Sequence, residues 1–534
     1  MLQTLSVIGR EFTLSLIHAA LRKTGEELAR MLDDLQLGEF IYEQPAVGDT
    51  EYIFKHALTQ EVAYNSVLIE RRKQTHERIG LAIESLYGDS IDDHLSELAH
   101  HFSRSGDTDR AVRFLTLACR QSLDRYAYAE AGARLREGLL QIRKLPESSE
   151  RDVRELEILG ALSDVAWVST GVDAPETRKV TERAAALAER TGNILELVRQ
   201  LNLLRVTMQR AGDFVSAFSL ANQILELAER EGSPASFADA YQGTLQARFY
   251  SGDLAGMEEQ FALWRNYQEA TRAEGNSRVV GLVIVLATAA LAAWSMGRIR
   301  LARDRMAEAV AMAATSKDPF ALMVGKSMES ILFRNLREPE AALAAAKQST
   351  SIAEENSLRF NMDVSSLTTW AIANLGDPAE AMDLVRREIA DSTNTRSMIS
   401  LTSGLFVYSE LQAMAGMHDE AMDSIQTALS PENQDQSFRP ELIRIRGELW
   451  SRRGDHRAAE ADFRAALKRS KQMRAKMLEL RAATSLARLL HDTDRREEAR
   501  AILAGIYDWF TEGFDTADLK DAKALLDDLG VSAH

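Results

Sequence analysis

The chain has 534 residues, with 64 basic and 80 acidic side chains and a formal net charge of −16. This length exceeds what one hydrophobic core accommodates, so it predicts several domains or an extended array of repeats. The single cysteine, Cys119, excludes an intramolecular disulfide and any cysteine-based zinc or iron–sulfur site. The acidic balance argues against binding of nucleic acid over the surface as a whole.

Residues 1–90 contain the strongest strand signal of the chain. Two short helices are predicted at residues 10–21 and 24–35, the second opening with a Thr-x-x-Glu capping box at Thr24. Residues 40–54 hold two β-rich runs around a turn of Pro, Gly and Asp, which is typical of a hairpin. Helix, helix and hairpin together predict a winged-helix-like domain that contains a small β-hairpin.

The helix that would enter a DNA groove in such a domain, residues 26–35, is acidic. It carries four acidic side chains against the single basic Arg30, and residues 1–90 hold 9 basic and 14 acidic residues. Phosphate would be repelled here, so a protein contact is favoured over DNA readout, which stays as the alternative. The basic run at residues 71–73 is a local exception with two interpretations, a contact for an ATPase core or an exposed helix start.

Three histidines near residue 100 raise the question of a metal site. His94 and His101 are seven residues apart, farther than the i,i+4 spacing of a chelating helical pair, and His100 adjoins His101. We therefore expect ordinary helical or core roles for them, and a buried, small-hydrophobe role for Cys119. The sequence predicts no metal site, no cofactor site and no catalytic residue.

From residue 106 onward, short turn signals centred on glycine recur along the chain. Seven glycines anchor these turns: Gly106, Gly212, Gly252, Gly297, Gly376, Gly416 and Gly454. Two further anchors, Leu336 and Asp494, are not glycine and are placed where the period requires a turn. From Gly212 onward the successive spacings run from 38 to 45 residues. A fixed period of this kind is the signature of a repeat architecture.

The residues that follow each turn also repeat. The fifth position after the anchor is alanine in eight of nine repeats, and the ninth position is apolar in all nine. The alanines predicted to pack between helices are Ala111, Ala217, Ala302, Ala381, Ala421, Ala459 and Ala499, with Ala341 following the Leu336 anchor. The fifth and ninth positions are four residues apart, so they lie on one face of a helix. Each unit is therefore predicted to be a helix, a left-handed glycine turn and a second helix.

One repeat shows the landmarks of a known motif. Residues 454–467, GDHRAAEADFRAAL, resemble the tetratricopeptide repeat in their order of glycine, alanine, aromatic residue and alanine. We therefore predict a mainly α fold, with a winged-helix-like domain at residues 1–90 and a tetratricopeptide-like helical solenoid at residues 91–530. The groove of such a solenoid favours a protein or peptide partner.

Residues 279–296 form the most apolar stretch, with 18 consecutive uncharged residues. This length reaches that of a short membrane span. Five alanines and the polar Thr288 and Ser295 weigh against that interpretation, and the repeat phase requires a buried helix at this position. We predict a buried solenoid helix, no membrane contact and a cytoplasmic setting.

Residues 1–12, 54–79, 97–115 and 509–529 carry a wider resemblance. They are similar to bacterial class III adenylate/guanylate cyclases in which an AAA/STAND-type ATPase and then tetratricopeptide repeats follow the cyclase domain. In that family the segment matching residues 1–90 is the winged-helix piece just after the ATPase core. Related ATPase–repeat transcription regulators share this piece, so the resemblance implies signal transduction without fixing the effector.

The cyclase and ATPase domains of that family have no counterpart in this chain. The nearest approach to a phosphate loop, VGKS at residues 324–327, has Phe320 where the first glycine is required and falls in a predicted repeat helix. We therefore expect a C-terminal fragment or a split or truncated gene product without enzyme activity. A non-catalytic interaction module is the leading hypothesis, ahead of a DNA-binding transcription regulator and a nucleotide enzyme.

Overall fold

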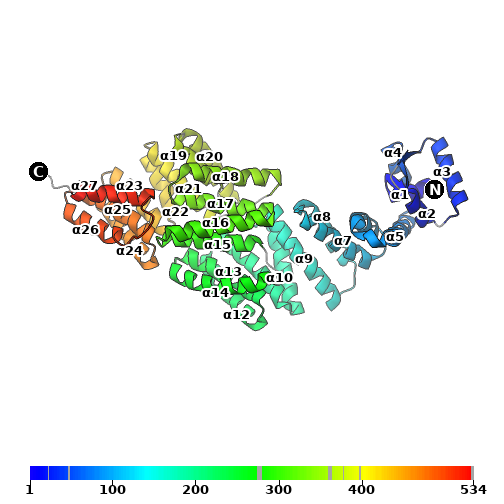
Figure 1. The fold of residues 1–534 in the computed structure, drawn as a ribbon, viewed down its shortest axis with the longest axis horizontal. Helices are drawn as coiled ribbons and strands as arrows, with labels where there is room; N and C mark the ends of the chain where they lie inside the picture. Colours follow the sequence, from blue (N-terminus) through cyan, green and yellow to red (C-terminus); the bar gives the residue numbers. More distant parts are fainter. Residues whose placement is uncertain are drawn as a thin grey trace. The chain divides into compact units, whose positions relative to one another are not determined.

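The computed structural model describes residues 1–21, 23–45, 49–172, 174–273, 279–358, 364–376, 378–395 and 398–530. Within these ranges the chain forms 27 α-helices, a short 3-10 helix and three β-strands (Figure 1). It divides into two compact units, unit 1 (Met1–Val165) and unit 2 (Ala166–His534). The fold is therefore mainly α, as the sequence predicts.

Unit 1 opens with alternating short helices and strands. Their bounds are α1 (Leu2–Ile8), β1 (Glu11–Thr13), α2 (Leu14–Leu21), α3 (Gly25–Leu37), β2 (Ile41–Pro45) and β3 (Thr50–Phe54). The strands form an antiparallel sheet in the order β1-β3-β2, with Phe12 opposite Tyr52 and Tyr42 opposite Ile53. The predicted hairpin is the β2–β3 pair, and its turn at residues 46–48 lies outside the described residues.

The first strand, β1, corrects the prediction of a continuous helix at residues 10–21. Phe12 is buried between more exposed neighbours, which is the alternation of a half-buried strand. Thr13 then begins α2, because its hydroxyl oxygen accepts a hydrogen bond from the Leu16 amide at 3.3 Å. Helix α3 begins where predicted, since the Thr24 hydroxyl accepts a hydrogen bond from the Glu27 amide at 3.4 Å.

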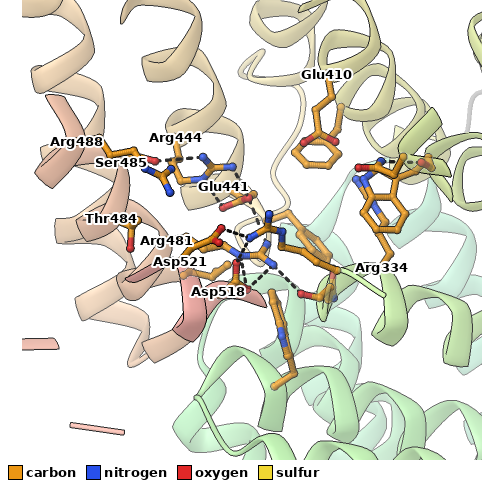
Figure 2. Close-up of a pocket in the computed structure, with 18 residues that line it drawn as sticks. Arg334, Glu410, Glu441, Arg444, Arg481, Thr484, Ser485, Arg488, Asp518 and Asp521 are labelled. Atoms are coloured by element: carbon orange, nitrogen blue, oxygen red, sulfur yellow. Dashed lines mark hydrogen bonds and ion pairs between the residues drawn. The ribbon is translucent and has the colours of Figure 1, made fainter. Parts of the chain in front are cut away.

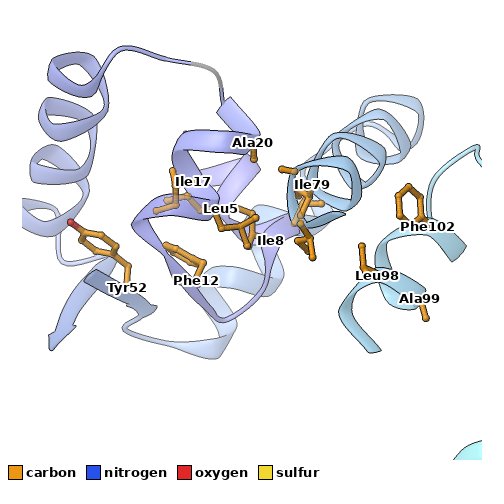
Figure 3. Packing of buried hydrophobic residues seen from close by; sticks show 14 of the residues in the cluster. Leu5, Ile8, Phe12, Ile17, Ala20, Tyr52, Ile79, Leu98, Ala99 and Phe102 are labelled. Atoms are coloured by element: carbon orange, nitrogen blue, oxygen red, sulfur yellow. The ribbon is translucent and has the colours of Figure 1, made fainter. Parts of the chain in front are cut away.

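One hydrophobic core joins the elements of unit 1 from α1 to α7 (Thr108–Asp124) (Figure 3). Leu5, Phe12 and Ile17 pack with Ile79 and with Phe102 from later helices. The helices that follow β3 are α4 (Ala57–Asn65), α5 (Ile69–Leu86), α6 (Leu95–Ser103), α7 (Thr108–Asp124), α8 (Tyr128–Ile142) and α9 (Ser149–Ser169), with the 3-10 helix at Gly88–His94. Ile79 lies on α5 and Phe102 on α6. The core thus continues past residue 90. The predicted boundary between the winged-helix-like domain and the repeats, at residues 90 and 91, stays a prediction.

Unit 2 is a succession of antiparallel helix pairs. The helices are α10 (Pro175–Thr191), α11 (Ile194–Arg210), α12 (Phe214–Glu231), α13 (Pro234–Ser251), α14 (Leu254–Ala273), α15 (Val279–Ser295), α16 (Ile299–Ser316), α17 (Pro319–Asn335), α18 (Pro339–Glu355), α19 (Val364–Leu375), α20 (Pro378–Thr395), α21 (Met398–Met414), α22 (His418–Ala428), α23 (Arg439–Arg452), α24 (His456–Met473), α25 (Lys476–Asp492), α26 (Arg496–Tyr507) and α27 (Ala517–Gly530). Neighbours in the chain pack on each other, which gives the tetratricopeptide-like α-solenoid.

The turn glycines of unit 2 join the two helices of each pair. Six of them have left-handed backbone, with φ between 79° and 119°: Gly212, Gly252, Gly297, Gly376, Gly416 and Gly454. Such a conformation suits glycine because it has no Cβ. Gly106 departs from the expectation, because α6 ends at Arg104 in right-handed conformation and Gly106 has no positive φ.

The packing alanines lie at the interfaces between helices. Each of the seven that follow an anchor at the fifth position is no more than 2% exposed: Ala111, Ala217, Ala302, Ala381, Ala421, Ala459 and Ala499. The predicted anchor at Leu336 is wrong by one residue. Arg337 has the left-handed φ of 61°, and Ala342 rather than Ala341 is fully buried. The degenerate anchor Asp494 has a φ of 60°.

The apolar stretch at residues 279–296 forms α15, a helix buried within unit 2. Its residues from Val285 to Ser295 are all buried, including Thr288 and Ser295, whose hydroxyls donate to backbone carbonyls one turn earlier. Among the described residues, no helix is both long enough and apolar enough to span a bilayer.

Candidate ligand site inside the solenoid

The solenoid of unit 2 folds back on itself, so that early and late repeats are in contact. The Val215 amide donates to the Gln434 side-chain oxygen at 3.1 Å across 219 residues, and the Arg300 amide donates to Glu512 at 3.1 Å across 212 residues. The Gln436 amide also donates to the Tyr250 carbonyl oxygen at 2.8 Å. These contacts join about half of the unit's length and create an interior lined largely by the first helices of the pairs.

Three turn glycines lie where early and late repeats meet. A Cβ on Gly212 would stand 2.9 Å from the Met398 side chain, and one on Gly297 would stand 2.9 Å from the rings of Trp509 and Phe510. Gly252 lies similarly close to a late-repeat side chain, at 3.1 Å. These glycines therefore permit both a local turn and a close tertiary contact.

A group of charged and polar residues, which we call the clasp, joins α17 and its turn to α25 and α27. The clasp consists of Asn335, Arg337, Arg481, Asp518 and Asp521. Arg337 contacts Asp518 at 3.4 Å and Asp521 at 2.6 Å, and Arg481 donates to the Asn335 carbonyl oxygen at 2.6 Å. Arg481 also pairs with Asp518 at 2.9 Å. The clasp holds residues together that are more than 140 positions apart in the chain.

A polar cavity of about 290 Å³ lies beside the clasp (Figure 2). In its wall, Arg444 donates twice to the Glu441 carboxylate, at 2.8 and 3.0 Å, and Arg481 reaches the same carboxylate at 3.3 Å. Burial alone would raise the pKa of Glu441, but the two guanidinium groups lower it to about 2. The Glu441 carboxylate is therefore ionised at neutral pH and holds its two cations in place.

The cavity also presents polar atoms that the ion pairs leave unused. One carboxylate oxygen of Glu410, the Asn335 amide nitrogen and the Trp294 indole nitrogen are buried and have no hydrogen-bond partner within the described residues. Burial raises the pKa of Glu410, against the attraction of Arg334 and Arg444. In Figure 2 the Glu410 carboxylate lies apart from the cluster of Glu441, Arg444 and Arg481. Unused donors and acceptors in one cavity are what a polar ligand requires.

A second, more apolar cavity of about 180 Å³ adjoins the polar one. Both cavities are lined by Arg334, Phe406 and Phe438, and the Arg334 guanidinium stands 4.4 Å from the Phe406 ring centre. The aliphatic residues of this apolar cavity come from α11, α15, α17, α19 and α23: Val206, Ile284, Leu291, Met328, Ile331, Leu367 and Leu442. A polar chamber next to an apolar one favours a ligand with both kinds of surface.

Of the residues singled out in the sequence, Thr288 lines the apolar cavity, whereas the predicted turn and packing residues line neither cavity. The turn glycines and packing alanines lie on turns and helix faces, and the lining residues were not predicted. A usable signal was present, because first helices carry charges on otherwise buried faces, such as Glu441 and Arg444 three positions apart. Residues 324–327, the weak likeness to a phosphate loop, lie within α17, where Lys326 pairs with Glu329 at 2.9 Å.

The histidines of unit 1 take different positions. His101 is buried, and its Nδ1 lies 3.0 Å from Nδ1 of His76, which in turn contacts the Tyr64 hydroxyl at 3.1 Å. His94 lies 3.2 Å from Glu97. Over the described part of the chain, no group of three or more histidine, cysteine or acidic residues is arranged to hold a metal ion.

The remaining sequence candidates of unit 1 are a thiol and a basic run. Cys119 is buried in the core, and burial raises the pKa of its thiol to about 11. In the run at residues 71–73, Arg72 stacks 4.3 Å from the Tyr64 ring centre and Lys73 pairs with Glu70. The thiol is thus an inert core group, and the run lies at the start of α5.

No protein-family model matches the chain. An uncharacterized protein of Rhizobium meliloti (strain 1021) is 31% identical over 186 residues, which is 35% of this chain and 18% of that protein. The chain therefore aligns with less than a fifth of that relative's length.

Several solved structures resemble the chain. A Signal Transduction ATPase with Numerous Domains (STAND) protein with a tetratricopeptide repeat sensor from Pyrococcus horikoshii has a TM-score of 0.44 and 12% identity, over 80% of this chain and 61% of that one. The APC/C hetero-tetramer Cut9–Hcn1 has the same TM-score and identity, over 86% and 94%. NprR in complex with its cognate peptide NprX has a TM-score of 0.39 and 12% identity, over 54% and 81%.

Because these TM-scores are low, the class of protein rests on the chain itself. Its helix pairs, its period of about forty residues and its left-handed turns define a tetratricopeptide-like α-solenoid, preceded by a small three-stranded sheet.

Proposed function

We propose that this chain is a non-catalytic regulatory and protein-interaction module of a STAND-ATPase-type signalling protein. Its repeats bind a protein or peptide and thereby control an ATPase or nucleotide-cyclase effector. The observation that carries the proposal is the interior of unit 2, where two adjoining cavities lie beside the clasp that joins early to late repeats. An occupant of the polar cavity would contact Arg481 and Arg337, so binding would bias the closure of the solenoid.

Residues 1–90 are proposed to be a winged-helix-like domain that contacts the effector. The order of helices and strands from α1 to β3, with β1 completing the sheet, supports this. An apolar surface patch formed by Leu58, Val62, Leu68 and Ile69, each more than 60% exposed, is the proposed contact with an ATPase domain. The family resemblance implies such a domain next to this segment and a setting in the bacterial cytoplasm, and both are part of the proposal.

Photo-crosslinking tests this proposal. A photoreactive amino acid at Leu68 of the full chain is expected to form an adduct in host cells with a protein segment that contains a phosphate-loop ATPase. The matched control is the same amino acid at Leu140, which is also exposed but lies on α8. No specific adduct at Leu68, or the same adducts at both positions, contradicts the proposal.

The alternative is a DNA-binding transcription regulator of the ATPase–repeat type, in which α3 would be the reading helix. Its acidic residues Glu26, Glu27, Asp33 and Asp34 are all exposed, so phosphate would meet negative charge. We expect the full chain to show no binding to duplex DNA at low salt in a fluorescence anisotropy titration. Binding that weakens steeply with added salt would favour the alternative.

A further inference from the structure

A fully buried arginine stands behind the wall of the apolar cavity. Arg205 on α11 is 0% exposed, and its hydrogen bonds to described residues all go to neutral amides. Its Nε donates to Asn202 at 3.3 Å, and its two terminal nitrogens donate to Gln209 at 2.6 Å and to Gln246 at 2.7 Å. Burial lowers the pKa of Arg205 to about 10, so the guanidinium is charged at neutral pH. Within the described ranges, no carboxylate pairs with it.

This arrangement fixes the orientation of two glutamines in the cavity wall. A guanidinium carries only N–H donors, so Gln209 and Gln246 must turn their oxygens toward Arg205. Their NH2 groups therefore remain for the cavity, which both residues line. In the described part of the chain, neither NH2 group has an acceptor, and both residues are more than 90% buried. Two positioned donors therefore remain for a ligand in this cavity.

The charges around the cavity also favour an anion. Arg205 lies behind its wall with only amide partners among the described residues, and Asp435 is the one carboxylate among the cavity's described lining residues. That carboxylate is already used, because it accepts hydrogen bonds from the Ser437 amide and hydroxyl at 2.7 and 2.6 Å. The uncompensated charge of Arg205 polarises the glutamine amides and strengthens their NH2 groups as donors.

The size of the cavity limits the ligand. Its volume of about 180 Å³ is slightly larger than a cavity of about 150 Å³ that binds benzene. It therefore accommodates one apolar group of about six to eight carbons. Ile284, Leu291 and Met328 provide the apolar wall for such a group.

We propose that the apolar cavity binds a small organic carboxylate with one apolar group. The carboxylate accepts hydrogen bonds from the NH2 groups of Gln209 and Gln246, and the apolar group packs on the aliphatic wall. This inference rests on the proposed binding role of the solenoid interior and names the ligand class. The same chemistry is presented by the C-terminal residue of a peptide and by a short acyl chain.

Calorimetric titration of the full chain distinguishes these sources. N-acetyl-leucine represents the peptide end and octanoate the acyl chain, with N-acetyl-leucinamide and octanamide as their neutral counterparts. We expect at least one carboxylate to bind ten times or more as tightly as its amide. The carboxylate that binds identifies the source. Equal affinity for carboxylate and amide, or no binding of either carboxylate at millimolar concentration, overturns the inference.

Two variants locate the site. Gln246→Glu places a carboxylate against Arg205, which balances the buried charge and removes an NH2 donor. It is expected to keep or raise the melting temperature and to weaken carboxylate binding at least tenfold. Gln242→Met is the control, because Gln242 lines the same cavity but has no bond to Arg205. Retained carboxylate preference in Gln246→Glu overturns the inference.

The proposed function has a separate readout. Carboxylate binding without a specific adduct at Leu68 contradicts the effector contact and leaves the ligand site intact. An ATPase adduct at Leu68 without carboxylate binding supports the effector contact and overturns the ligand site.

Discussion

The two units bury polar groups in opposite ways. Unit 1 encloses the ring pair of His76 and His101, both of which stay neutral because burial lowers their pKa, that of His76 to about 3. Unit 2 encloses a charged network in which Glu441 is shared by Arg444 and Arg481. A neutral pair is stable only while it stays unprotonated, whereas the pKa of Glu441, about 2, keeps the network charged far below neutrality.

The difference indicates that the units respond to different conditions. Mild acid acts on unit 1, where a proton on either histidine would be buried near Arg72, Arg104 and His100. Loss of one partner of an ion pair acts on unit 2, because the remaining charge would be left in a buried site. Because hydrogen exchange reports on each backbone amide, the stability of each unit can be measured separately in the full chain.

The largest expected effect is that of Arg481→Ala. The change leaves Asp518 with half-exposed Arg337 as its remaining cation in the described network and removes the hydrogen bond to the Asn335 carbonyl. We expect unit 2 to lose about 3–5 kcal/mol of unfolding free energy. Hydrogen exchange followed by mass spectrometry should show faster exchange in α17, α25 and α27 and unchanged exchange in unit 1.

A neighbouring arginine provides the control for this prediction. Arg488 also lies on α25 and lines the polar cavity, but it is exposed and makes no ion pair among the described residues. Arg488→Ala is expected to change the unfolding free energy by less than about 0.5 kcal/mol. Equal effects of the two variants would show that the buried network does not hold the repeats together.

The turn glycines sharpen the comparison further. Gly297→Ala in unit 2 is expected to cost about 2–3 kcal/mol, because φ is 82° and the new methyl group would meet Trp509 and Phe510. Gly106→Ala in unit 1 is expected to change stability by no more than about 0.5 kcal/mol, since its φ is not positive and the space around it is open. Urea denaturation of the full chain, with exchange rates assigned to each unit, measures both.

Acid is expected to weaken unit 1 selectively. The folded-state pKa of His76 lies below its unfolded value of about 6.5, so the unfolded chain binds more protons as the pH falls below that value. Stability is therefore fully present above pH 6.5 and declines below it, by about 2 kcal/mol at pH 5 for this residue alone.

The measurement is hydrogen exchange at pH 7 and pH 5, corrected for the intrinsic rate of each amide. From pH 7 to pH 5, the corrected exchange rates in α5 and α6 should rise more than those in α23 and α25. His76→Gln should flatten this dependence even where it lowers stability at pH 7. An unchanged pH dependence in that variant would contradict the role of the histidine pair.

Much of the fold of unit 2 could be predicted from the repeat period of the sequence. Glycine turns and buried alanines are local requirements of a helix pair, so their spacing alone predicts the pairs. The errors occurred where that local chemistry is absent. Arg337 adopts a left-handed turn without being glycine, so the predicted anchor was placed one residue too early, at Leu336. Gly106 follows a helix that ends without a left-handed residue.

The candidate site could not be predicted in the same way. Its walls join α15 and α17 to α25 and α27, and the hydrogen bond between Arg481 and Asn335 spans 146 residues. A forty-residue period describes neighbouring helices and contains no information about contacts several repeats apart. The same limit applies to Gly297, whose turn role follows from the sequence while its contact with Trp509 does not.

The smallest expected effect separates the buried part of the clasp from its exposed part. Arg337 and Asp521 are 2.6 Å apart, but their side chains are 44% and 42% exposed, so water and salt screen the pair. Asp521→Asn should cost at most about 0.5 kcal/mol in low salt, and the difference should vanish in 1 M NaCl, whereas the effect of Arg481→Ala should persist there. Denaturation curves of both variants at the two salt concentrations measure this. If Asp521→Asn proves as damaging as Arg481→Ala, the early and late repeats are held together at the surface, and occupancy of the interior cavities cannot be what governs their closure.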